Sequence, residues 1–177
     1  MSTELDPATG ISTLPLADVV FDHAAVAAHR IRDLLPIYRN LLGGQFHLGG
    51  DNVRVGYRGL QLRYGDGSKI ELLEPLEGST FLDSFFRRNP LGGLHHLTFK
   101  IVSMTDALAA LAGLGYIVHG QSDADPNWNE VFVHPREALG TLLQLAQAGP
   151  NYGVPPEYGL ADVLAGRGNH GNGVPSR

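Results

Sequence analysis

The sequence predicts an α+β fold made of two βαβββ modules, and two observations support this. His23 and Glu71 lie 48 positions apart, and so do His96 and Gln144, each within a short apolar run typical of a strand. The second pair repeats the first at an offset of 73 residues, which is the length of one supersecondary unit. Each module is therefore expected to supply two of these four polar side chains.

The first module is predicted over residues 18–76. Its expected elements are a strand over 18–25, a helix over 30–42, and strands over 52–57, 59–64 and 69–74. Apolar residues recur at helical spacing between Arg30 and Leu42, but Pro36 interrupts the pattern. A proline inside a helix costs about 3 kcal/mol, so we expect Pro36 to kink this helix or to lie in its first turn.

A connector over residues 77–93 is expected to hold a short helix capped by Ser79 and stopped by Asn89 and Pro90. The second module, 94–147, repeats the order of the first. Its expected elements are a strand over 94–101, a helix over 104–112, and strands over 116–119, 130–134 and 141–145. Residues 1–17 are interpreted as a leader, and the Gly- and Pro-rich residues 148–177 as a surface arm or a disordered end.

Composition excludes several classes of function. The formal charge is −5, with 13 basic and 18 acidic residues, and the chain lacks the basic surface that nucleic-acid binding needs. No stretch approaches the roughly 20 apolar residues of a membrane span, so we expect a soluble, cytoplasmic protein. The sequence contains no cysteine, so any bound metal must be held by nitrogen and oxygen atoms.

Strand alternation indicates which polar side chains face a common site. In the strand over 94–101, His96 shares a face with Thr98 and Lys100, whereas His95 shares the opposite, apolar face. His95 is therefore interpreted as a packed imidazole or as a partner of a ligand. Glu71 and Gln144 each stand in an otherwise apolar strand, where an unpaired carboxylate or amide would cost several kcal/mol. Together with His23 they indicate a metal site.

The motifs around these residues resemble the vicinal oxygen chelate superfamily, which includes glyoxalases and dioxygenases, and most closely its methylmalonyl-CoA epimerases. The similar segments, between about Val19 and Gln147, are FDH, KIELLEPL, GGLHHLTF, VFVHP and GTLLQL. The resemblance implies that two βαβββ units close one cleft with a divalent metal on its floor. It also implies an epimerase or isomerase that removes a proton next to a carbonyl through a metal-bound enolate or enediolate.

Position by position, His23, Glu71 and His96 match the first three metal ligands of that family, and Gln144 stands where the epimerases have glutamate. The resemblance implies a divalent ion such as Zn, Co, Mn or Ni. An amide is a weak ligand, so Gln144 is expected either to coordinate through its carbonyl or to bind a metal-held water. For proton transfer we expect Glu71 and Glu130, with Gln61 as an alternative that orients substrate.

The substrate is expected to be a small carbonyl compound, either methylmalonyl-CoA-like or a sugar-like cyclic polyhydroxy ketone. Arg87 and Arg88 are candidates to bind the phosphates of an acyl-CoA. Two other classes remain open: a ring-opening dioxygenase or lyase of the same superfamily, and a metal-free small-molecule binding protein of the resistance type. Proteins that resemble this chain pair as symmetric dimers, so a homodimer is expected.

Overall fold

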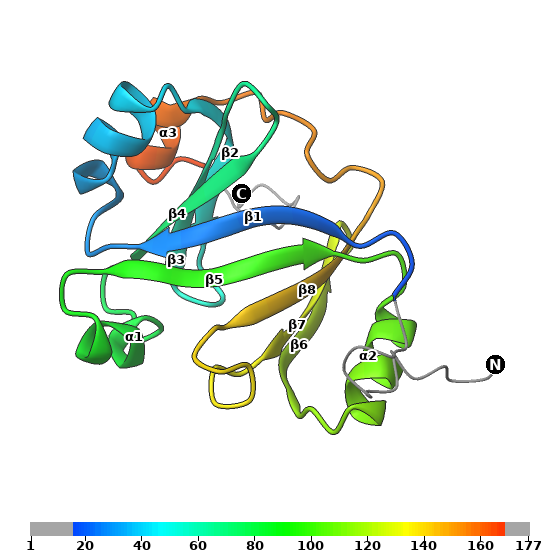
Figure 1. The fold of residues 1–177 in the computed structure, drawn as a ribbon. Coiled ribbons are helices and arrows are strands. Elements are labelled where there is room, and N and C mark those ends of the chain that lie inside the picture. Colours follow the sequence, from blue (N-terminus) through cyan, green and yellow to red (C-terminus); the bar gives the residue numbers. More distant parts are fainter. Residues whose placement is uncertain (1–15, 169–177) are drawn as a thin grey trace.

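The computed structural model of the protein describes residues 16–168. Its strands form one curled, mixed sheet in the order β2-β3-β4-β1-β5-β8-β7-β6 (Figure 1). The strands are β1 (Val20–Ala27), β2 (Gln45–Asn52), β3 (Tyr57–Arg63), β4 (Lys69–Pro75), β5 (Gly93–Lys100), β6 (Val118–Asp125), β7 (Trp128–Val133) and β8 (Leu143–Ala148). The helical elements are η1 (Ile31–Asp33, 3-10), η2 (Pro36–Leu41, a π-helix), α1 (Asp83–Arg88), α2 (Met104–Gly113) and α3 (Leu160–Leu164).

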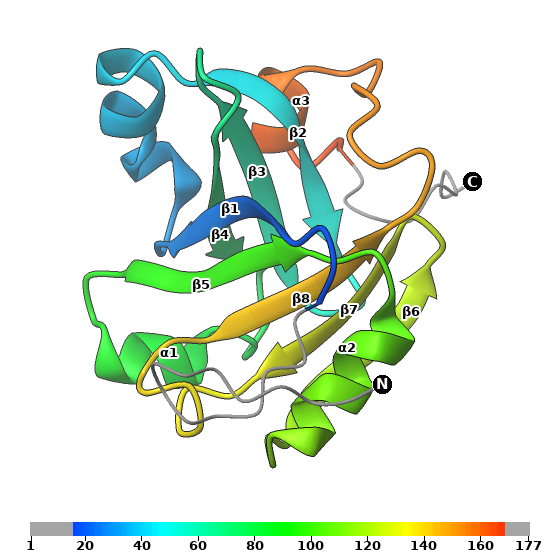
Figure 2. The ribbon, with the colours of Figure 1, turned by 45° about the vertical axis from the view of Figure 1, so that its right-hand side comes forward.

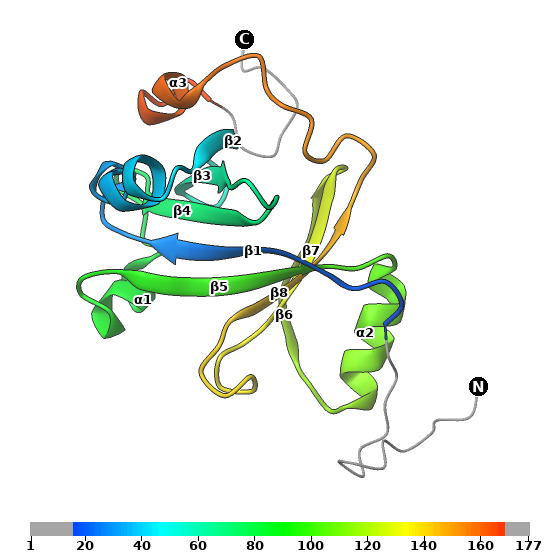
Figure 3. The ribbon, with the colours of Figure 1, turned by 45° about the horizontal axis from the view of Figure 1, so that its top comes forward.

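The sheet has the internal symmetry that the repeat predicts. Strand β1 pairs in parallel with β4, β5 pairs in parallel with β8, and β1 and β5 pair antiparallel where the halves join. Figures 2 and 3 show β1 and β5 side by side, between the group β2–β4 and the group β6–β8. The predicted α+β fold of two βαβββ modules is confirmed.

Each module has its own apolar core. The core of the first module contains the fully buried residues Ile31, Leu60, Leu62 and Leu72. The core of the second contains Ile101, Met104, Ala107 and Val131, and α2 covers it with its N-terminus capped by Ser103. Because the apolar side chains of each module pack into these cores, the opposite face of the sheet can carry polar side chains. No helix within residues 16–168 has the length and apolarity needed to cross a membrane.

Two predicted elements of the first module are wrong in part. The helix expected over 30–42 is divided into η1 and η2, because Pro36 cannot donate a backbone hydrogen bond and instead begins the second piece. The strand expected over 52–57 is a turn, and the strand lies earlier, at β2. Alternation in Val53–Tyr57 is typical of a strand, but Gly56 adopts φ +97° and reverses the chain there.

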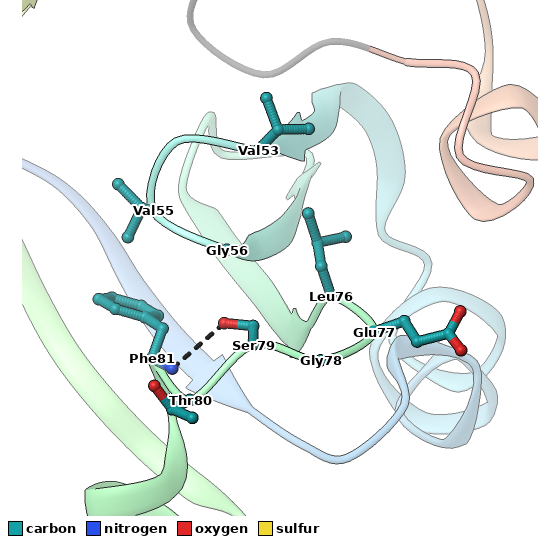
Figure 4. A pocket seen from close by; sticks show the side chains of 9 residues that line it. All are labelled: Val53, Val55, Gly56, Leu76, Glu77, Gly78, Ser79, Thr80 and Phe81. Atoms are coloured by element: carbon teal, nitrogen blue, oxygen red, sulfur yellow. Dashed lines mark hydrogen bonds between the residues drawn. The ribbon is translucent and has the colours of Figure 1, made fainter.

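The connector forms α1, and Phe85 in this helix and Leu82 just before it are buried against the first module. Ser79 does not cap this helix; its Oγ accepts a hydrogen bond from the backbone N–H of Phe81 at 3.2 Å. Figure 4 shows this loop facing the turn at Gly56. The Gly56 carbonyl accepts from the backbone N–H of Leu76 at 3.0 Å, which ties the two loops together.

Gly56→Ala is expected to lower the free energy of unfolding by about 2–3 kcal/mol, because the left-handed backbone disfavours a side chain. A Cβ there would also lie 2.9 Å from the Cβ of Ser79. Gly78→Ala is the matched control: Gly78 has φ +75° but no atom within 4 Å of an added Cβ, so it should lose only about 1 kcal/mol. Urea unfolding measures both, and equal losses would contradict the close contact with Ser79.

The chain after β8 is packed, in contrast to the expected surface arm or disordered end. It runs from β8 across to α3, which lies beside β2 (Figure 1). Val163 of α3 is fully buried in the core of the first module. Residues 149–168 therefore belong to the folded unit, while the rest of the predicted arm and most of the predicted leader lie outside the described residues.

Candidate metal centre

Strand register brings the polar residues of both modules onto one face of the sheet. Gln61 lies opposite Glu71, Glu71 opposite Ala25, and Ala25 opposite His96. In the neighbouring row, His23 lies opposite Thr98 and Thr98 opposite Gln144. Side chains in register on adjacent strands point to the same side, so both rows face a common site. The methyl group of Ala25 leaves room for the larger side chains around it.

His23, Glu71 and His96 form a buried cluster that could hold a divalent metal ion. Glu71 Oε2 lies 3.4 Å from His23 Nε2 and 3.7 Å from His96 Nε2. Ligand atoms about 2.1 Å from one ion lie roughly 3–3.4 Å apart, so small side-chain movements would complete the coordination. His96 Nε2 is buried without a hydrogen-bond partner among the described residues, which is costly unless it binds an ion. The cluster therefore fits a metal.

His95 lies at a β-bulge, where the pairing of β1 and β5 shifts between Ala25 and Val26. Its side chain therefore stays next to His96 and does not lie on the opposite side of the strand, as alternation predicts. Its ring packs edge-on against Phe85, with ring centres 5.0 Å apart. Its Nδ1 lies 2.8 Å from Nδ1 of His96. For His96 to offer a lone pair at Nε2, its Nδ1 must carry the proton and donate to His95. His95 thus fixes the tautomer and orientation of a candidate ligand.

Gln144 links the cluster to Glu130. Its Oε1 accepts a hydrogen bond from Thr98, and its Nε2 donates to Glu130 Oε2 at 2.6 Å. The indole N–H of Trp128 donates to the same oxygen at 3.0 Å. Burial nevertheless raises the pKa of Glu130, against these hydrogen bonds, which lower it. Glu130 is thus a partly buried carboxylate that takes up a proton more readily than usual.

His23 is held by a buried carboxylate that the sequence analysis did not single out. Asp22 Oδ2 accepts from His23 Nδ1 at 2.7 Å, which turns Nε2 toward Glu71. Burial alone would lower the pKa of His23, but the hydrogen bond to Asp22 and the carboxylate of Glu71 outweigh it and raise the pKa to about 9. An ion at Nε2 would replace a proton there.

The pKa values of the two imidazoles of β5 are shifted in the opposite direction from that of His23. Burial lowers the pKa of His95 to about 4 and that of His96 to about 3. Both therefore stay neutral in the folded protein at pH values where the unfolded chain binds protons.

The stability of the metal-free protein is expected to be greatest near pH 6.5. Below it, His95 and His96 favour the unfolded chain by about 2 kcal/mol each at pH 5. Above it, the stabilisation from the raised pKa of His23 is lost as pH rises toward 9. Urea unfolding of chelator-treated protein from pH 5 to 9 measures this. His95→Gln should flatten the acid side, and a level profile between pH 5 and 6.5 would contradict neutral buried imidazoles.

Other predicted residues take different positions. Gln61 is buried beside Glu71 and faces the site, whereas Arg87 and Arg88 are exposed at the end of α1. Sequence reasoning missed Asp22, Trp128 and Tyr152. Asp22 is next to His23 in the sequence, and Trp128 lies two positions before Glu130, on the same face of its strand. Both residues could therefore have been inferred from the sequence. Tyr152 could not, because it stands in a segment without periodicity.

An open pocket lies at the edge of the first module. It is formed by the turn before β3 and the loop after β4, as Figure 4 shows; the lining residues are Val53, Val55, Gly56, Leu76, Glu77, Gly78, Ser79, Thr80 and Phe81. The Phe81 ring stacks on Tyr57, with ring centres 5.4 Å apart. The walls combine apolar side chains with polar ones, including the carboxylate of Glu77.

The fold and the cluster define a class of protein with two βαβββ units and a group of buried side chains that could hold a metal ion. Residues 22–132 match the model of the Glyoxalase/Bleomycin resistance protein/Dioxygenase superfamily. The chain belongs to this superfamily.

Among the relatives are acyl-CoA epimerases. The ethylmalonyl-CoA/methylmalonyl-CoA epimerase of Cereibacter sphaeroides is 29% identical over 129 residues, which cover 71% of this chain and 96% of that protein. The crystal structure of methylmalonyl-CoA epimerase from Mycobacterium tuberculosis aligns with TM-score 0.66 and 23% identity, over 81% of this chain and 97% of the other. A Streptomyces coelicolor epimerase variant in complex with 2-nitronate-propionyl-CoA aligns with TM-score 0.62 and 25% identity, over 73% and 96%.

Proposed function

We propose that this protein is a metal-dependent epimerase or isomerase that moves a proton on the carbon next to a carbonyl. The observation that supports this most directly is the cluster of His23, Glu71 and His96, to which the partly buried carboxylate of Glu130 is linked through Gln144. The similarity to acyl-CoA epimerases supports the same reaction class.

In this proposal, His23, Glu71 and His96 hold the ion. A bound divalent ion would polarise the substrate carbonyl and stabilise the negative charge that develops when the neighbouring carbon loses its proton. Glu130 is the proton carrier, since its raised pKa brings it closer to the working pH of a general base. Gln144 and Trp128 fix the Glu130 carboxylate, and Glu71 is the candidate for proton transfer on the other side of the carbon.

The substrate is proposed to be either an acyl-CoA thioester like methylmalonyl-CoA or a cyclic polyhydroxy ketone. The epimerase relatives favour the thioester. The lining of the pocket at the edge of the first module includes Glu77 and no Lys or Arg, which suits an uncharged group better than the phosphates of coenzyme A. Both substrate classes are therefore tested in one experiment.

The test is proton exchange in deuterated water, using purified protein of measured metal content. Methylmalonyl-CoA and a cyclic polyhydroxy ketone are supplied separately, and deuterium at the carbon next to the carbonyl is followed by NMR. Exchange that requires metal supports the proposal and identifies the substrate class. Metal-loaded protein that exchanges neither substrate contradicts the proposal for both classes.

A ring-opening dioxygenase is the second candidate, and one observation favours it. The carbonyl oxygen of Gln144 is engaged by Thr98, which leaves two histidines and one carboxylate as the candidate ligand set. Non-haem iron oxygenases use this ligand combination. Oxygen uptake by Fe²⁺-loaded protein with a catechol would support this candidate over the epimerase.

A further inference from the structure

Tyr152, in the chain after β8, contacts both sides of the proposed site. Its hydroxyl donates to Asp22 Oδ2 at 2.7 Å and accepts from Lys69 Nζ at 2.9 Å. Its ring stacks on Trp128, with ring centres 4.6 Å apart and planes inclined by 29°. Residue 152 lies outside the stretch 22–132 that matches the superfamily model. These contacts therefore come from a part of the chain that the superfamily model does not match.

The first set of contacts leads to His23. The Asp22 side chain is 1% exposed, and its carboxylate accepts hydrogen bonds from His23, Tyr152 and Lys69, the last at 2.8 Å. Lys100 Nζ lies 3.2 Å from its other oxygen. A buried carboxylate keeps its position only while its donors hold it. The Tyr152 hydroxyl thus helps to hold the group that orients the His23 imidazole.

The second set leads to Glu130. The Trp128 indole stacks with the ring of Tyr152 and also with that of His23, whose ring centre is 6.5 Å away with planes inclined by 27°. The indole N–H donates to Glu130. Stacking by Tyr152 therefore fixes the donor that holds the carboxylate.

The segment that carries Tyr152 is anchored beyond it. The Tyr158 hydroxyl donates to the carbonyl of Gly49 at 2.8 Å, and Val163 is buried in the first core. The backbone N–H of Asp51 donates to the carbonyl of Gly168 at 2.9 Å. Tyr152 is thus held between β8 and these attachments to β2.

We propose that Tyr152 is a positioning residue that holds His23 through Asp22 and Glu130 through Trp128. The segment 149–168 then contributes a positioning residue to the site. The roles given to His23 and Glu130 rest on the proposed function, but the contacts of Tyr152 do not.

The test compares Tyr152→Phe, Tyr152→Leu and the control Tyr158→Phe, which loses a hydroxyl from the same segment away from the cluster. Two readouts are used: Co²⁺ titration of the metal-free protein, and the emission of Trp128, the only tryptophan in the sequence. Tyr152→Phe should weaken Co²⁺ binding about 10-fold with unchanged emission, since partners of metal ligands contribute about 10- to 100-fold. Tyr152→Leu should also make Trp128 more accessible to acrylamide, and Tyr158→Phe should change neither readout.

Co²⁺ affinity of Tyr152→Phe equal to that of wild type would overturn the positioning of His23. Unchanged acrylamide quenching in Tyr152→Leu would overturn the positioning of Glu130. If the wild-type protein bound no Co²⁺, the proposed function would fail. The proposal for Tyr152 would then be decided by Trp128 emission alone, so the two failures are distinguishable.

Discussion

His96→Ala is expected to abolish metal retention and, with it, activity. The substitution removes one of three candidate ligands, including the buried Nε2 that has no hydrogen-bond partner within residues 16–168. Loss of a partner of a ligand already costs about 10- to 100-fold in metal affinity, so loss of a ligand should cost more than about 100-fold. Titration of chelator-treated protein with Co²⁺ or Zn²⁺ measures the affinity directly, without a substrate.

His95→Ala is the matched control, because it changes the neighbouring histidine of β5, which is not part of the ligand cluster. It removes the ring contact with Phe85 and the hydrogen bond to His96, so it should mainly lower the free energy of unfolding and weaken metal binding by about 10-fold. Equal loss of metal from both variants would show that the assignment of His96 as the ligand is wrong.

Glu130→Gln is expected to lower the rate of proton exchange by about 100- to 10,000-fold while metal affinity changes little. The amide keeps the size of the side chain but cannot take up a proton, and Glu130 lies outside the ligand cluster. Because the pKa of Glu130 is raised by burial, the wild-type rate should fall on the acid side at a pH above the ordinary range of a carboxyl. The variant should lose this dependence.

The measurement is the rate of deuterium incorporation against pH, with metal content verified for each protein. Glu157→Gln serves as the control, since Glu157 is exposed in the chain after β8. A Glu130→Gln enzyme that retains the wild-type rate would remove Glu130 from the reaction and leave Glu71 as the remaining carboxylate of the pair.

Much of the fold could be predicted because the sequence repeat shows which strands of the first module correspond to which strands of the second. The predictions for β1, β4 and β5 agree with the structure within two residues at each end, since their apolar alternation reflects burial. β2 was missed because QFHLGGDN contains two glycines and little alternation. β6 extends to Asp125, well beyond the prediction, because an edge strand with mostly exposed side chains needs no apolar pattern.

For the site, spacing and alternation singled out His96, which lies with His23 and Glu71. They placed His95 on the opposite side of β5, whereas the bulge there keeps the two imidazoles in contact. They did not predict the environment of the ligands. Thr98 was placed on the correct face but given no role, although it bonds both His23 and Gln144. Tyr152 could not be found from sequence, because its contacts depend on how the chain after β8 returns to the first module.

Because the chain after β8 packs back against the first module, it affects the order in which the protein folds during its synthesis on the ribosome. Val163 completes a core formed with residues such as Ile31 and Leu60, more than 100 positions earlier in the chain. The amino-terminal half is therefore synthesised long before the side chain that fills its interior. We expect this half to remain loosely packed during translation and to settle only after the nascent chain has passed residue 163.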